Sequence, residues 1–414
     1  MKIKFTELYK GAIEENKYRF EKLKLGFVEE FGADNIESLQ FFSAPGRTEI
    51  GGNHTDHNHG RVLAAAVNLD IIGAVKKRND DKIYLKSAGY NKVDVIDLSS
   101  LEVNISEKEK SAALIRGICA RCKELGFNIG GFEAYTISNV LKGSGLSSSA
   151  AFEILVVTII SHLYNDGKID AVTAALISKY AENVYFGKPS GLMDQMASSV
   201  GGFTAIDFKD DNNPIIEKID FNLQSSGYAL CIVDTKGNHA DLTSDYAAIP
   251  NEMKQVAEFF GKQYLREVDE AEFIAKIPEI RKIAGDRAVL RVIHFFNEDR
   301  IADEEAKVLK DGDFEQFKKL VQTSGFSSVS KLQNIFSTSA PQEQGLSLAL
   351  AITERILIEQ GAFRVHGGGF AGTIQAFVPF DMLDKYKSEI EKIFGENSCY
   401  VLEVRNVGGT KIEF

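Results

Sequence analysis

The sequence has few cysteines, no cluster of basic residues and no long apolar run. Its 414 residues carry a formal net charge of −11 without clustered Lys and Arg, which argues against a nucleic-acid-binding surface. The longest apolar stretch, residues 154–160, is far too short to cross a bilayer, and residues 1–32 lack a signal-peptide core. We therefore expect a cytoplasmic protein without nucleic-acid or membrane partners, of undetermined oligomeric state.

The few cysteines do not form a recognisable disulfide framework. They are Cys119, Cys122, Cys231 and Cys399. The first two make a Cys-x-x-Cys spacing, which also occurs in zinc and redox sites, but no second pair completes a metal site. Because both fall within residues 111–125, which have the pattern of an amphipathic helix, the sequence favours inert helix cysteines.

Two common nucleotide-binding motifs are also missing. The sequence has no Walker A loop, and Ser148 stands where the dinucleotide fingerprint needs its third glycine. What it has is a glycine- and serine-rich stretch between a strand-like run, 132–137, and the apolar run 154–160. Its central residues are Gly143, Ser144, Gly145, Leu146, Ser147, Ser148 and Ser149.

This stretch predicts a strand, a tight turn and a helix. Glycines let a backbone approach a ligand closely, and the N-terminus of a helix favours an anion. The stretch is therefore a candidate phosphate cradle. The alternative is a flexible turn that only begins a buried helix.

A second unusual stretch, residues 44–60, gathers polar side chains between Pro-Gly and Gly-Gly steps. We expect an irregular loop here. Its histidines and Asp56 would suit zinc, but a second ligand cluster is lacking. Binding of a polyol fits as well, because His54 and Asp56 supply hydrogen-bonding groups for hydroxyls and Arg47 supplies a fixed fork for phosphate. A solvated loop without function stays open.

The order of predicted elements indicates two α+β domains. A helix is expected at 1–32, followed by antiparallel hairpin strands at 71–76, 82–87 and 93–97 and a helix at 171–186. Beyond residue 206 we expect a strand at 228–234, helices within 249–309 and at 343–361, a glycine loop at 365–372 and the elements 373–378, 381–394 and 400–404. We place the N-terminal domain at 1–205 and a ferredoxin-like domain at 206–414.

Asp194 is a candidate catalytic carboxylate. It lies in the first turn of a short helix expected at 192–196, where the helix dipole helps to keep it ionised. An aspartate at a helix start without any further role is the alternative.

Five motifs in this order resemble those of galactokinases, whose superfamily also holds homoserine, mevalonate and phosphomevalonate kinases. They are Pro45-Gly46-Arg47, Gly52-x-His54-Thr55-Asp56, Gly143-x-Gly145-Leu146-Ser147-Ser148-Ser149-Ala150, Gly191-Leu192-Met193-Asp194-Gln195 and Gly367-Gly368-Gly369-Phe370. The resemblance implies transfer of phosphate from ATP to the anomeric C1 hydroxyl of galactose, in a cleft between two α+β domains.

The resemblance also implies roles for individual residues. Asp194 matches the catalytic aspartate that takes the proton of the C1 hydroxyl, and Arg47 matches the active-site arginine. Ser149 and Glu182 match the pair that binds Mg2+, a hard cation that takes oxygen ligands. The 143–149 loop corresponds to the phosphate cradle.

The sugar is expected to contact His54, Asp56, Tyr246 and Asn53, the last of which departs from the family pattern. Galactokinases have glutamate at the Asn53 position and often asparagine at the Glu49 position. The family's glutamate accepts a hydrogen bond from the sugar near C6, whereas asparagine can also donate and carries no charge. A sugar with a carboxylate at C6, such as galacturonic acid, is therefore an alternative substrate to galactose.

Two further readings remain open. Some relatives bind sugar and ATP only as sensors, but here the catalytic set and the serine loop are complete. A non-sugar kinase such as a mevalonate kinase is also conceivable, but the polyol-binding residues around His54 argue against it.

Overall fold

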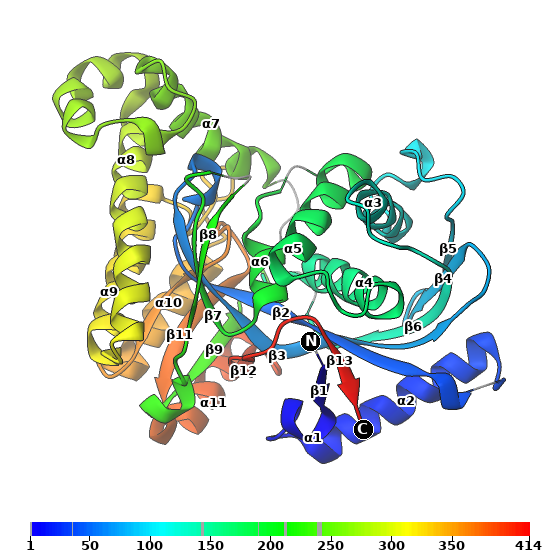
Figure 1. Ribbon diagram of the computed structural model, residues 1–414. Helices are drawn as coiled ribbons and strands as arrows, with labels where there is room; N and C mark the ends of the chain where they lie inside the picture. The colour runs from blue at the N-terminus through cyan, green and yellow to red at the C-terminus, as the bar shows by residue number, and fades with distance from the viewer. Residues whose placement is uncertain (1, 35, 142–144, 189, 211–212, 238–241) are drawn as a thin grey trace.

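The computed structural model describes residues 2–34, 36–141, 145–188, 190–210, 213–237 and 242–414. It is a mixed α+β fold with two sheets (Figure 1). Among these residues, none of the helices combines the length and apolar character that a membrane span requires.

The larger sheet has nine strands. Seven run in the order β1 (Lys2–Lys4), β13 (Thr410–Glu413), β2 (Gln40–Gly51), β3 (Arg61–Lys77), β6 (Phe132–Ser138), β4 (Lys82–Ser87) and β5 (Val93–Asp97). The N-terminal residues of β3, 61–65, also pair with β7 (Phe203–Asp207), and β7 forms a hairpin with β8 (Ile215–Ile219). The 82–87 and 93–97 strands form the predicted hairpin, but β4 pairs with β6 in parallel and not with β3.

The smaller sheet has four antiparallel strands. Their order is β10 (Ala362–His366), β11 (Thr373–Pro379), β9 (Tyr228–Asp234) and β12 (Cys399–Leu402). Along the chain they follow a βαββαβ sequence, with the last strand beside the first. This is the ferredoxin-like arrangement that the sequence predicts.

Helices cover the larger sheet. On one side lie α3 (Ser111–Glu124), α4 (Ser148–Tyr164), α5 (Ala171–Tyr180) and α6 (Met193–Val200), and near the chain termini lie α1 (Phe5–Leu8) and α2 (Ile13–Phe31) (Figure 1). α4 is apolar on most of its surface because it is buried in the main core, whereas α2 buries one stripe that includes Phe20, Leu23 and Phe27. The prediction of one helix over the first 32 residues is wrong. Lys2–Lys4 forms a strand that pairs with the C-terminal strand β13, and two separate helices follow it.

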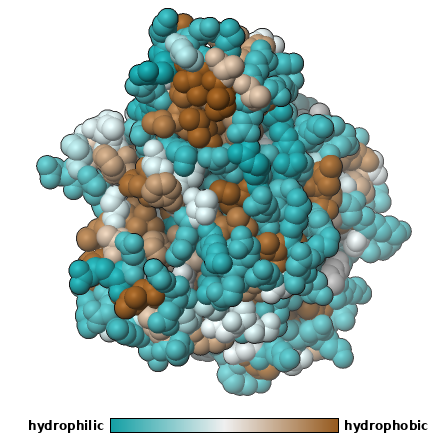
Figure 2. Space-filling model, turned by 90° about the vertical axis from the view of Figure 1, so that its left-hand side faces the viewer, coloured by the Kyte–Doolittle hydropathy of each residue, from teal (hydrophilic) through white to brown (hydrophobic). Residues whose placement is uncertain are grey.

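The remaining helices belong to the second half of the chain. They are α7 (Thr243–Phe259), α8 (Glu270–Lys310), α9 (Phe314–Ser327), α10 (Gly345–Leu357) and α11 (Leu383–Phe394). A break at Gly285 divides α8, and the tip formed by α7 and the start of α8 extends from the body. Figure 2 shows apolar side chains gathered on this tip, where Phe259, Ile274 and Ile283 are exposed.

Two expectations about organisation need correction. The stretch 44–60 is not irregular throughout, because β2 continues to Gly51 with bulges after Pro45 and Glu49 that absorb its glycines. A domain boundary between 205 and 206 would cut through β7, and both β8 and the C-terminal β13 belong to the larger sheet. The two sheets therefore do not divide the chain at that position.

Candidate active site

The two predicted catalytic residues are in direct contact. Arg47, on β2, donates from Nε and Nη2 to Oδ1 of Asp194 at 2.7 and 2.6 Å, although 147 residues separate them. Asp194 stands in the first turn of α6, as predicted. Burial would raise the pKa of Asp194, but the Arg47 charge and hydrogen bonds outweigh it and hold that pKa below 3.8. The carboxylate is therefore ionised at neutral pH.

The serine loop reaches the same carboxylate. Ser147 Oγ donates to Asp194 Oδ2 at 2.8 Å, and Arg47 Nη1 donates to the carbonyl of Gly145. Gly145 has φ 72° and Ser147 has φ 51°, so the chain turns sharply just before α4 begins at Ser148. Leu146 is buried beneath this turn. Gly143 and Ser144, also predicted in the cradle, lie outside the described residues.

Glu182 lies in a π-helical segment, Ala181–Phe186, that continues α5. Its buried carboxylate accepts hydrogen bonds from Lys188 Nζ at 2.9 Å, Ser190 Oγ at 2.5 Å and Gln195 Nε2 at 2.8 Å. Gln195 follows Asp194 on α6, so this short helix carries one carboxylate and hydrogen-bonds the other, that of Glu182.

These residues suit Mg2+, which proteins commonly hold with one or two oxygen ligands while phosphates and waters complete the shell. The Lys188 ammonium shows that Glu182 accommodates a cation at Oε1. Ser149, in the first turn of α4, keeps a partly exposed side chain. No group of three or more His, Cys, Asp or Glu side chains placed for a metal occurs in the described part of the chain. A site built from Ser149 and Glu182 would thus depend on the nucleotide for further ligands.

Sequence reasoning missed a second carboxyl group beside Glu182. Glu153, on α4, is fully buried and accepts one hydrogen bond from Gln195 Nε2 at 3.0 Å, while its Oε1 has no partner among the described residues. Burial and the neighbouring Glu182 raise the pKa of Glu153 well above its usual value. A glutamate within an apolar helix run carries no sequence signal that distinguishes it from a surface residue.

The predicted sugar-contacting residues gather around the second glycine loop. His54 Nε2 donates to the carbonyl of Gly368 at 3.0 Å, and Tyr246 Oη donates to that of Gly369 at 2.9 Å. Asp56 packs against Gly191, because a Cβ there would lie 2.6 Å from Asp56 Oδ2. Residues from both sheets therefore meet at one place, next to the helix that carries Asp194.

Asn53 does not present its side chain as predicted. It is fully buried, and its amide nitrogen donates to Glu49 Oε1 at 2.9 Å and to the carbonyl of Gly367 at 2.7 Å. Its side-chain oxygen accepts from Asn334 Nδ2 at 2.9 Å. Protein groups therefore occupy both ends of the Asn53 amide.

Glu49, the other departure from the family pattern, is paired across the two sheets. Arg364, on β10, is completely buried and donates to Glu49 Oε1 at 2.8 Å and to the carbonyl of Ile50 at 2.8 Å. A guanidinium charge that is removed from water needs a partner of opposite charge, because its desolvation is costly. The carboxylate of Glu49 is that partner for Arg364.

His366, at the end of β10, connects the second glycine loop with β2. Its Nε2 lies 3.0 Å from Thr48 Oγ1 and its Nδ1 lies 2.9 Å from Thr373 Oγ1. Burial, with the nearby Arg47 and Arg364 charges, lowers its pKa to about 3. His366 is thus a neutral residue that connects the strand of Arg47 to the smaller sheet.

Two matches to protein families agree with this site. The Galactokinase galactose-binding signature matches residues 26–77, and the GHMP kinases N terminal domain matches residues 113–202. The resemblance to galactokinases is confirmed. The galactokinase signature covers Arg47, His54 and Asp56, and the GHMP kinase domain covers Ser149, Glu182 and Asp194, so the two matched stretches contain most of the predicted site residues.

Solved structures show the same fold. Lactococcus lactis galactokinase, determined with galactose, superimposes with a TM-score of 0.79 at 24% identity, over 94% of this chain and 99% of that one. Mevalonate kinase from Methanococcus jannaschii gives a TM-score of 0.62 at 18% identity, over 88% and 98% of the two chains. Phosphomevalonate kinase from Streptococcus pneumoniae, with phosphomevalonate and AMPPNP, gives 0.60 at 12% identity, over 88% and 98%.

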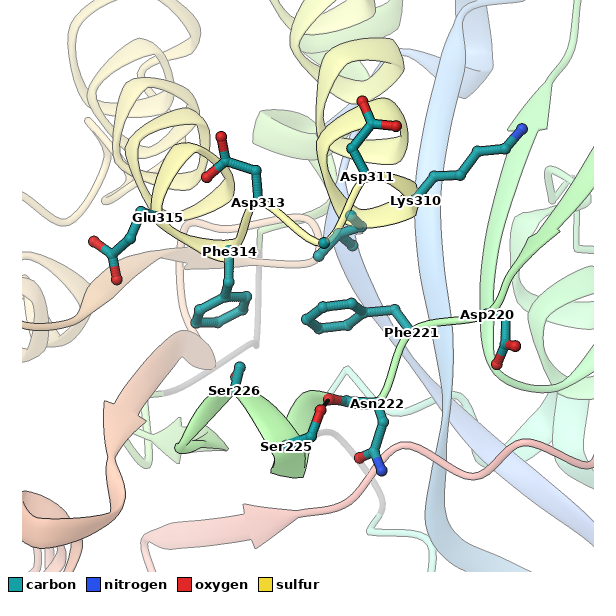
Figure 3. A pocket seen from close by; sticks show the side chains of 12 residues that line it. Asp220, Phe221, Asn222, Ser225, Ser226, Lys310, Asp311, Asp313, Phe314 and Glu315 are labelled. Atoms are coloured by element: carbon teal, nitrogen blue, oxygen red, sulfur yellow. Dashed lines mark hydrogen bonds between the residues drawn. The ribbon is translucent and has the colours of Figure 1, made fainter.

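A surface cavity of about 580 Å³ lies away from these residues, between the connection from β8 to β9 and the α8–α9 turn. Figure 3 shows the rings of Phe221 and Phe314 facing each other there, while Asp311, Asp313 and Glu315 point outward. The ring centroids are 5.8 Å apart at an interplanar angle of 11°. The polar groups do not converge, so this cavity is not the candidate site.

The Cys-x-x-Cys pair is buried within α3. Burial raises the pKa of the Cys122 thiol to about 12 and that of Cys119 even further. Thiols of this kind are poor nucleophiles and poor metal ligands, in agreement with the prediction that they are inert.

Proposed function

We propose that this chain transfers the terminal phosphoryl group of ATP to the C1 hydroxyl of galactose. The main support is the contact of Asp194, in the first turn of α6, with Arg47 and with Ser147, the residue before α4. The carboxylate is ionised and partly exposed, with 29% of its side chain accessible, so it can accept a proton from a bound hydroxyl. Arg47 keeps it ionised and offsets charge on the phosphoryl group during transfer.

ATP would lie with its phosphates along the loop that ends at Ser149, against the N-terminus of α4. The dipole and free N–H groups of that helix end favour an anion. Mg2+, held by Ser149 and Glu182 together with the nucleotide, would neutralise phosphate charge. Ser190 and Gln195 would keep the Glu182 carboxylate in position for the ion by their hydrogen bonds to it.

Galactose would be held by His54, Asp56 and Tyr246, which surround the second glycine loop. Burial and the neighbouring His57 lower the pKa of His54 to about 4, so His54 is neutral and acts as a hydrogen-bonding group. We propose that Asn53 shapes this pocket by tying the loop to Glu49 and Gly367, without touching the sugar. Galacturonic acid remains the second candidate, because Arg364 pairs with the Glu49 carboxylate and Asn53 adds no further negative charge near the loop.

The test is ADP release by the purified protein with Mg-ATP against galactose, galacturonic acid, N-acetylgalactosamine, arabinose and mevalonate. Phosphorylation at C1 removes the reducing end, so loss of reducing sugar identifies the position. Asp194→Asn should lower kcat by about 10²-fold to 10⁴-fold, the usual contribution of a general base. Asp381→Asn, the same change at an exposed residue in the turn between β11 and α11, is the matched control.

Turnover of galactose that is lost in Asp194→Asn and kept in Asp381→Asn would support the proposal. Turnover of galacturonic acid alone would replace the substrate and keep the mechanism. If sugars and ATP bind without turnover, the chain is a sensor and the proposed activity is wrong.

A further inference from the structure

The main chain just before His54 is held by a buried carboxylate from the other half of the molecule. Glu298, on α8, accepts hydrogen bonds from the N–H groups of Gly52 and Asn53 at Oε1, at 3.2 and 3.1 Å. Ser324, on α9, donates to the same oxygen at 2.6 Å. Glu298 is completely buried, so solvent does not compete for these bonds.

One turn earlier on α8, His294 contacts the carbonyl group of the same residue, Asn53. Its Nε2 lies 2.9 Å from the carbonyl oxygen of Asn53, and its Nδ1 lies 2.9 Å from Ser327 Oγ. A carbonyl only accepts, so Nε2 carries the hydrogen and Nδ1 accepts from the serine. Positions 294 and 298 are four residues apart and therefore share one face of the helix. Through this face, α8 binds both the N–H and the carbonyl oxygen of Asn53.

The Glu298 carboxylate keeps its charge despite its burial. Burial alone would raise its pKa, but the charge of Arg364, whose Nη1 lies 3.7 Å away, and the hydrogen bonds from Ser324 and the main chain lower it. A charged acceptor binds N–H groups about twice as strongly as a neutral one. The loop is therefore fixed by charge-assisted bonds.

The main chain around Gly52 adopts a conformation that depends on close contacts with its neighbours. Gly52 has φ 88°, and a Cβ there would lie 2.5 Å from the carbonyl oxygen of Arg61. His54 also has a positive φ, of 60°. The direction in which His54 and Asp56 leave the turn is thus set by the residues that Glu298 holds.

We propose that Glu298 is a positioning residue for substrate: it sets the orientation of the loop that presents His54 and Asp56 to the sugar. The inference rests on the proposed function and deepens it. It assigns control of sugar affinity to a helix of the second half of the chain, which does not itself contact the sugar.

The test compares Glu298→Gln with Glu305→Gln. Glu305 is another fully buried glutamate on α8, but its oxygens have no partner among the described residues. It therefore matches Glu298 in helix, burial and residue type, and it packs against Gly51 without a hydrogen bond to the loop. It differs in charge, because burial and the neighbouring Glu298 raise the pKa of Glu305 well above its usual value. Glu298→Gln should raise the KM for galactose and the Kd from calorimetry about tenfold, since bonds to a charged acceptor are the stronger ones. The KM for ATP should stay unchanged, and Glu305→Gln should change neither constant.

Amide hydrogen exchange supplies a readout that needs no sugar. Peptides covering residues 52–60 should exchange about tenfold faster in Glu298→Gln and at the wild-type rate in Glu305→Gln. If Glu298→Gln fails to fold, Ser324→Ala should give a smaller effect in the same direction. An unchanged galactose KM with unchanged loop exchange, or equal rises in both KM values, would overturn the inference. Faster exchange in a protein without sugar turnover would reject only the proposed function.

Discussion

Ser147 illustrates how a loop serine affects the chemistry of a distant carboxylate. It was expected only in the phosphate cradle, yet its hydroxyl is bonded to Asp194 Oδ2. That bond is one of the causes that lower the pKa of Asp194. Ser147 thus contributes to the ionisation of the proposed base as well as to the loop.

We predict that Ser147→Ala moves the acid limb of the kcat/KM profile to higher pH. The hydrogen bond stabilises the ionised carboxylate, so its loss raises the pKa of Asp194. The kcat at neutral pH should fall by about tenfold or less, because Arg47 still holds Oδ1. Profiles of the two proteins over the same buffers give the comparison, and coincident acid limbs would contradict the prediction.

The buried histidines predict how stability depends on pH. The folded pKa of His54 is about 4 and that of His366 about 3, against an ordinary value of 6.5. Below 6.5 the unfolded chain binds protons that the folded chain excludes, so the free energy of unfolding decreases as pH falls. Each histidine should contribute about 1.4 kcal/mol per pH unit down to its folded pKa.

Urea unfolding at several values between about pH 7 and pH 5 measures this slope. His366→Gln can still hydrogen-bond with Thr48 and Thr373 but does not titrate. Toward pH 5, where the unfolded histidine is protonated, its slope should be lower than that of the wild type by about 1.4 kcal/mol per pH unit. An identical slope in the two proteins would show that His366 is not excluded from protonation.

Among the elements, the end of β2 shows why the chain needs glycine at residue 52. We predict that Gly52→Ala lowers the free energy of unfolding by about 3 kcal/mol or more, because it adds a left-handed penalty to a collision with the backbone of Arg61 and Val62. Gly89→Ala is the control: its φ is 81°, with nothing within 4 Å of the added Cβ. That variant should lose only about 1–2 kcal/mol in urea unfolding. Equal losses would mean that the close approach at Gly52 is absent in solution.

The elements themselves were predictable where one local pattern decides them. The strands 82–87, 93–97 and 228–234 have the bounds that their sequences predict, and the helix expected at 111–125 is observed at Ser111–Glu124. The helix expected at 171–186 ends as α-helix at Tyr180 and continues as a π-helical segment, which places Glu182. The continuation of β2 was missed because its Pro and Gly residues suit a loop unless partners on β3 hold them in a bulged ladder.

At the scale of the whole molecule, Arg364 connects the two sheets through Glu49. We predict that Arg364→Met lowers the free energy of unfolding by about 3–5 kcal/mol, because two buried carboxylates lose their counter-ion. Adding Glu49→Gln should recover part of this loss, with a coupling energy of about 1–3 kcal/mol. The four proteins of this double-mutant cycle are compared by urea unfolding. Additive losses would mean that the ion pair does not couple the two sheets.

The sequence by itself determined the α+β class, the ferredoxin-like second sheet and the order of the motifs around Arg47, Ser149, Glu182 and Asp194. These features depend on local periodicity, on glycine and on residue types at fixed spacing, which one chain displays directly. Only the tertiary structure decided that Arg47 contacts Asp194, that Asn53 turns inward to Glu49, and that Glu298 accepts hydrogen bonds from the main chain just before His54. Such contacts join residues far apart in sequence, and burial, which sets their charge and strength, exists only once both sheets have formed.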